Sequence, residues 1–80
     1  MPKPEITLKL IENIADIKNE IHRNYLYSIE DVFTLYSVYI NENEVAVCNI
    51  NKKETGFDVV DFIGSGSCIK LIEEKLGSWE

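Results

Sequence analysis

The stretch VFTLYSVYINENEVAVCNI, residues 32–50, decides the fold class of this chain. Residues 32–40 are dense in β-branched and aromatic side chains, which is the composition of a β-strand. A polar run of alternating asparagine and glutamate fills residues 41–44, and asparagine tolerates the positive φ angles of tight turns. Residues 44–50 then form a second apolar run. The stretch predicts a β-hairpin closed by a two-residue loop at Glu42-Asn43.

This loop position also predicts a register for the hairpin. It places Ile40 opposite Val45 and Val38 opposite Val47 on one side of the sheet. A polar loop follows at residues 51–56, and residues 57–63 form a third apolar run. The central part of the chain therefore predicts three antiparallel strands, at residues 32–40, 44–50 and 57–63.

Helical spacing is found on both sides of this strand region. Leu10, Ile14, Ile17 and Ile21 are spaced as one apolar stripe, which predicts a helix that ends near residue 24. Residues 64–67, Gly-Ser-Gly-Ser, break the last strand, and residues 69, 72 and 76 give a second apolar stripe. We therefore expect a single α+β domain over residues 1–80, with the order helix, three-stranded antiparallel sheet, helix (αβββα) and both helices packed on one face of the sheet.

Charge and composition narrow the classes of partner. Eight Lys and Arg residues against fourteen Asp and Glu residues give a net charge of −6, which opposes direct binding to nucleic acid or to an anionic membrane. The chain has no apolar run long enough for a membrane span and no secretory signal in residues 1–5. Cys48 and Cys68 both lie in apolar runs, which favours two buried, reduced thiols. We therefore expect a cytoplasmic location.

The sequence contains no recognisable catalytic or metal-binding motif. His22 is the only histidine, and one histidine with two distant cysteines matches no zinc spacing. A thiol enzyme that uses Cys48 or Cys68 is kept as an alternative. The glycine link at residues 64–67 is interpreted as a strand-to-helix turn, with anion binding left open. We expect no cofactor and no metal.

The remaining feature is a group of acidic and tyrosine residues in the strand region and its loops. Tyrosine is enriched at protein interfaces, and carboxylates attract a basic partner. The predicted partner-binding residues are Glu30, Asp31, Tyr36, Tyr39, Glu42, Glu44, Glu54, Asp58 and Asp61.

The predicted order of elements resembles that of the double-stranded-RNA-binding domain, including a glycine-containing link before the last helix. In that family this region carries lysines that grip phosphates. Here residues 67–74 read SCIKLIEE, with one lysine and two glutamates. We therefore expect no RNA binding of that kind.

In size, acidity and lack of catalytic motifs, the chain is similar to small phage-encoded inhibitors, including anti-CRISPR proteins. This likeness implies a non-catalytic inhibitor that docks an acidic, tyrosine-bearing surface on a basic, nucleic-acid-binding site of a partner protein. One alternative is a structural homodimer or adaptor subunit, paired through a sheet face that the helices leave uncovered. The thiol enzyme is the second alternative.

Overall fold

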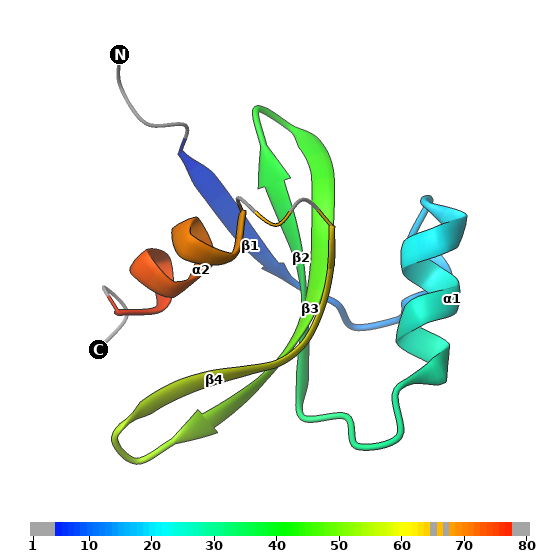
Figure 1. Cartoon of the computed structure of the whole chain (residues 1–80). Coiled ribbons are helices and arrows are strands. Elements are labelled where there is room, and N and C mark those ends of the chain that lie inside the picture. Colours follow the sequence, from blue (N-terminus) through cyan, green and yellow to red (C-terminus); the bar gives the residue numbers. More distant parts are fainter. Residues whose placement is uncertain (1–4, 65, 67, 78–80) are drawn as a thin grey trace.

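The computed structural model describes residues 5–64, 66 and 68–77, and it forms a four-stranded antiparallel sheet with two α-helices (Figure 1). The sheet order is β1-β2-β3-β4, so that each strand lies beside its neighbours in sequence. The α+β class is confirmed, but the predicted number of strands is wrong by one. The elements are β1 (Ile6–Leu10), the 3₁₀ helix η1 (Ile14–Asp16), α1 (Glu20–Ser28), β2 (Thr34–Ile40), β3 (Asn43–Lys53), β4 (Gly56–Gly64) and α2 (Cys68–Gly77).

The extra strand, β1, occupies residues up to Leu10, where the predicted helical stripe begins. It pairs with β2 in antiparallel register, with Ile6 opposite Ile40 and Leu8 opposite Val38. Its apolar residues alternate with polar ones, which is the period of a strand. The predicted helical stripe is therefore wrong, and the two residues at its ends, Leu10 and Ile21, are 56% and 69% exposed.

Two asparagine caps explain why helical structure starts later and is split. The side chain of Asn13 accepts a hydrogen bond from Ala15 N at the start of η1. The side chain of Asn19 accepts one from His22 N, three residues into the turn that begins α1. With a strand first and the helix between β1 and β2, the layout is not that of the double-stranded-RNA-binding domain.

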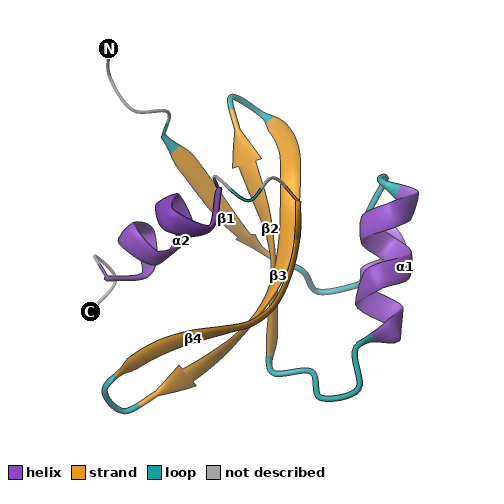
Figure 2. Cartoon of the chain, viewed as in Figure 1, coloured by secondary structure: helices purple, strands orange, loops and turns teal. Residues whose placement is uncertain are grey.

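The two α-helices lie on opposite faces of the sheet, which corrects the prediction that they share one face (Figure 2). Val47 and Cys48 are neighbours in β3, so their side chains point to opposite faces. Cys48 belongs to the core cluster that α2 completes with Ile72 and Leu76. Val47 belongs to the cluster that α1 completes with Leu26. Each face of the sheet is therefore covered by one helix.

The β2–β3 hairpin differs from the predicted one by one residue. Its loop is Asn41-Glu42, and both residues have positive φ, 51° and 69°. Positive φ at both positions is the signature of a type I′ turn, which matches the twist of paired strands. A register shift after Val38 then places Val38 opposite Ala46. The predicted pairing of Val38 with Val47 is therefore wrong, because those side chains lie on different faces.

The β3–β4 hairpin is longer than predicted, since β3 continues through residues 51–53. Lys53 forms an ion pair with Asp58 across the strands, and Lys52 lies over the ring of Phe57 at 6.0 Å. Charged side chains that meet partners across the strands extend the ladder into a stretch that composition alone assigns to a loop. A second register shift, between Asn49 and Ile50, leaves Val60 of β4 as a bulged residue.

The second helix agrees with its prediction. Its buried residues are Cys68, Ile72 and Leu76, which include two of the three predicted stripe positions. The sequence also favours Gly77 as the residue just past the helix end, but Gly77 is the last residue of α2. The sequence further predicts that Ser67 or Ser65 caps this helix and that residues 78–80 form a tail; these residues lie outside the described ones.

Candidate functional site

The buried amide side chain of Asn49 connects three segments of the chain. Asn49 lies in the middle of β3 and is completely buried. Its Nδ2 donates to the backbone oxygen of Asp31 at 2.8 Å and to Oδ2 of Asp61 at 3.0 Å. Its Oδ1 accepts from the backbone N–H of Phe33 at 2.8 Å. Asn49 therefore joins β3, β4 and the loop between α1 and β2.

These hydrogen bonds fix the course of the loop over residues 29–33. The N–H of Phe33 is bonded to the Asn49 side chain, and β2 begins one residue later, at Thr34. The observed strand therefore begins two residues later than the predicted strand, which started at Val32. Val32 and Phe33, which precede the strand, are 51% and 48% exposed.

An exposed surface of mixed character results, and we call it the Asn49-braced surface. It combines three exposed apolar side chains with three carboxylates, on the loop and on the adjacent bulge of β4. Its members are Glu30, Asp31, Val32, Phe33, Val60 and Asp61. Large apolar side chains that stay exposed on a hydrogen-bonded scaffold are typical of protein-interaction sites.

A hollow of about 360 Å³ opens within this surface. Tyr25 and Ile29 line it from α1 and the loop, and Val60 lines it from β4. Glu30, Asp31 and Asp61 also line the hollow. The space is therefore walled by apolar side chains and rimmed by carboxylates.

The other predicted acidic residues lie elsewhere in the structure. Glu42 and Glu54 occupy the turns before and after β3, which is the longest strand, so they lie beyond its opposite ends (Figure 1). Glu44 follows the first of these turns, and Asp58 is bound to Lys53 near the second. Among the predicted acidic residues, Glu30, Asp31 and Asp61 are brought together around one hollow.

The two predicted tyrosines do not share a surface. Tyr36 packs against the core cluster under α2. Tyr39 lies three residues along the same strand, and the ammonium group of Lys9 lies 4.6 Å from the centre of its ring. An odd separation along a strand places side chains on opposite faces. The predicted acidic and tyrosine surface is therefore divided between the two faces of the sheet.

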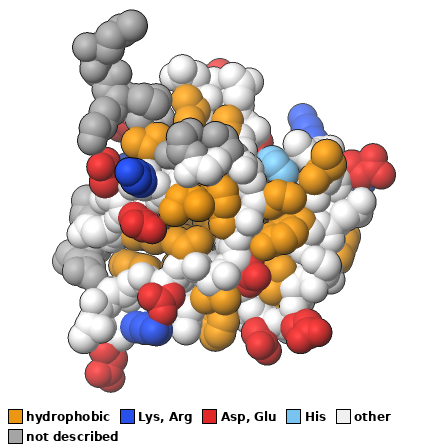
Figure 3. Space-filling model, in the orientation of Figure 1, with side chains coloured by type: hydrophobic (Ala, Val, Ile, Leu, Met, Phe, Trp, Pro, Cys, Tyr) orange, Lys and Arg blue, Asp and Glu red, His pale blue; other side chains and the backbone are white. Residues whose placement is uncertain are grey.

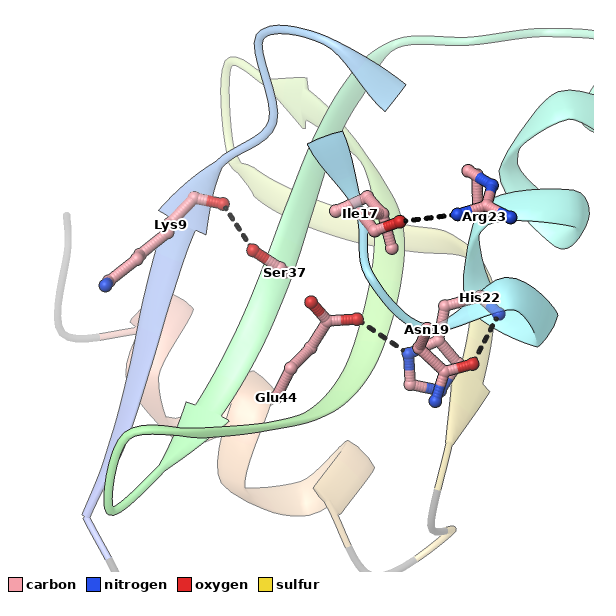
Figure 4. A network of polar contacts seen from close by, with 7 residues as sticks. All are labelled: Lys9, Ile17, Asn19, His22, Arg23, Ser37 and Glu44. Atoms are coloured by element: carbon pink, nitrogen blue, oxygen red, sulfur yellow. Dashed lines mark hydrogen bonds and ion pairs between the residues drawn. The ribbon is translucent and has the colours of Figure 1, made fainter. Parts of the chain in front are cut away.

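Glu44 has an internal role that the sequence did not reveal. Its Oε1 lies 2.8 Å from Nδ1 of His22, and the two side chains are only 15% and 9% exposed (Figure 4). In the same network, Arg23 donates to the backbone oxygen of Ile17 at 3.0 Å. These contacts hold α1 against β3, so His22 is used in packing and does not face a cysteine.

Both cysteines are free and buried, as predicted. Burial raises the pKa of the Cys48 thiol from 9.0 to about 12. A thiol in this state is a poor nucleophile near neutral pH, because the thiolate is the reactive form. The geometry therefore gives no support to a thiol enzyme built on Cys48.

This pKa shift predicts a specific loss of stability in alkali. Above pH 9 the unfolded chain has lost the Cys48 proton that the folded chain keeps until about pH 12. Stability must therefore fall as pH rises through this range, and at pH 10 the thiol contributes on the order of 1 kcal/mol of the loss. Urea unfolding of the wild type and of Cys48→Ala at pH 8 and pH 10 measures this contribution. An equal loss in both proteins would show that Cys48 is not the group responsible.

Among the described residues, no group of three or more His, Cys, Asp or Glu side chains is placed to hold a metal ion. No helix in the described part of the chain is long and apolar enough to cross a membrane. Comparisons with protein-family models, with curated proteins and with solved structures find no match to this chain.

The sequence contained one signal for this site that received no functional interpretation. Asn49 is the only strongly polar residue in the run from Val45 to Ile50. A buried amide in an apolar strand requires hydrogen-bond partners, so its position marks a place where other segments must approach. The exposed positions of Val32, Phe33 and Val60 had no such signal, since each lies in a run that is otherwise typical of a buried strand.

Proposed function

We propose that this chain is a non-catalytic protein-binding domain whose Asn49-braced surface docks on a basic site of a partner protein. The observation that carries the proposal is the fixed loop over residues 29–33, which presents exposed Val32 and Phe33 beside the carboxylates of Glu30 and Asp31. Exposed apolar side chains supply burial on binding, and the carboxylates select a cationic partner. An inhibitor that occupies the basic nucleic-acid site of a phage-defence protein is one form of this function.

The preorganisation of the surface supports this proposal. Asn49 is completely buried, and its hydrogen bonds hold the loop against the sheet before any partner arrives. A loop that is already ordered loses less conformational entropy on binding. The net charge of −6 adds long-range attraction to a basic partner.

Crosslinking in an extract of the native host tests the proposal. Three forms of the chain are each crosslinked to the proteins that they bind, and the captured proteins are identified. The wild type is compared with the double variant Glu30→Lys, Asp31→Lys and with the control Glu42→Lys, Glu54→Lys. Both variants change the net charge equally, and all four side chains are exposed. We expect one protein to be retained by the wild type and the control and lost from the first variant. Equal retention by all three forms would contradict the proposal.

The homodimer alternative loses the feature on which it was based. It required a sheet face that the helices leave uncovered, whereas α1 and α2 each cover one face. A self-association through the Asn49-braced surface would also bring its carboxylates together with their own copies, which is unfavourable. A basic protein partner is therefore the better-supported function.

A further inference from the structure

Strand β4 forms an edge of the sheet, and no strand among the described residues lies beyond it. It is 9 residues long, against 5 for the other edge strand, β1. Edge strands carry a row of backbone groups that an extended chain can pair with. Val60, the bulged residue of β4, is 47% exposed in the middle of this edge.

A hollow lies on each side of β4. The α1-side hollow, described above, is rimmed by Glu30, Asp31 and Asp61. The α2-side hollow has a volume of about 630 Å³ and is lined by β4 residues and by the last residues of α2. Val60 lines both of them. The open edge of β4 therefore runs between two spaces of different character.

Three apolar side chains contribute to the mixed lining of the α2-side hollow. Phe57 and Val59 line it from β4, and Leu76 lines it from α2. Figure 3 shows hydrophobic side chains gathered across the middle of the molecule in this orientation, with carboxylates along its lower part. The α1-side hollow has the more concentrated negative rim, because three carboxylates line it against the two, Asp58 and Glu73, of the α2-side hollow.

We propose that β4 receives an extended segment of the partner as an added strand, in which basic residues alternate with apolar ones. Successive side chains of a strand point to opposite faces, so that one set would enter the acidic α1-side hollow and the other would meet Phe57, Val59 and Leu76 in the α2-side hollow. This inference rests on the proposed function and specifies the chemistry of the partner segment. A second copy of this chain does not fit, because its own β4 carries Asp58 and Asp61 and would meet like charges.

A synthetic peptide tests the proposal without the natural partner. The probe is an alternating Lys-Val peptide as long as β4, that is 9 residues, with blocked ends. We expect it to bind with a Kd below about 1 mM and to slow amide hydrogen exchange within Gly56–Gly64. The same peptide with every backbone nitrogen N-methylated keeps its charge but has no N–H donor on either edge, so it should not pair with β4 or slow that exchange. A Glu-Val peptide should not bind.

Two variants of the protein locate the binding site. Val60→Lys places a positive charge between the two hollows and should raise the Kd of the Lys-Val peptide by about tenfold. Ile21→Lys makes the same change of charge on exposed helix α1 and should leave the Kd within about twofold.

Absence of binding at about 1 mM, equal binding of the N-methylated peptide, or slowed exchange at β1 in place of β4 would each overturn the edge proposal. None of these outcomes alters the capture experiment with Glu30→Lys, Asp31→Lys. The failure of that experiment would instead overturn the proposed function.

Discussion

Replacement of Asn49 by leucine is expected to lower the free energy of unfolding by about 3 kcal/mol. Leucine has a similar volume, so the change removes hydrogen bonds more than packing. It leaves the N–H of Phe33, the backbone oxygen of Asp31 and the carboxylate of Asp61 without the partner that Asn49 provides. A group that has lost its partner inside a protein costs more than the hydrogen bond itself contributed.

Urea unfolding of Asn49→Leu and of Asn51→Leu measures this effect with a matched control. Asn51 lies two residues along the same strand and is partly exposed, so its replacement should change stability by less than about 0.5 kcal/mol. The midpoint should fall for Asn49→Leu with an unchanged m-value. Amide exchange at Phe33 should also become faster, since that N–H loses its acceptor. Equal stability of the two variants would refute the structural role given to Asn49.

Replacement of Gly64 by alanine is the second substitution with a large expected effect. Gly64 ends β4 with a φ of +148°, a conformation that residues with a Cβ rarely adopt. An added Cβ would lie 2.5 Å from Cβ of Ala46 and 2.7 Å from the backbone oxygen of Val45. Both of these atoms belong to β3, so they cannot move away without disturbing the ladder. We expect a loss of about 3 kcal/mol or more.

Gly66→Ala is the control for this substitution, because nothing lies within 4 Å of a Cβ at that position. Thermal unfolding of both variants should show a large fall in Tm for Gly64→Ala and a small change for Gly66→Ala. A similar Tm for the two variants would contradict the close approach of β4 to β3 at Ala46.

The parts of the fold that could be predicted depend on local pattern. The apolar stripe of α2 and the β-branched runs of β2, β3 and β4 are each contained in one segment, so spacing and composition predicted them. Strand β1 is different, because it is short and its pairing with β2 joins segments about thirty residues apart in sequence. The i, i+4 spacing of Leu10 and Ile14 is typical of a helix, but the pairing of β1 with β2 outweighs this local preference.

The candidate site was predictable only in its chemistry. Glu30, Asp31 and Asp61 do lie around one hollow, and the basic partner inferred from the negative charge stays a prediction. Their grouping depends on Asn49, whose three hydrogen bonds reach residues on two other segments. The division of Tyr36 and Tyr39 between the two faces follows from the sheet geometry. Glu44 is held by His22, a contact between residues that are distant in sequence.

The rate of association with the captured partner tests the central claim most directly. It is measured for the wild type, for Glu30→Lys, Asp31→Lys and for Glu42→Lys, Glu54→Lys over a range of salt concentrations. We predict that the first variant associates about tenfold more slowly at low salt, with a flattened salt dependence, while the second stays close to the wild type. Equal slowing by both variants would mean that net charge alone steers binding, and it would contradict a docking role for the Asn49-braced surface.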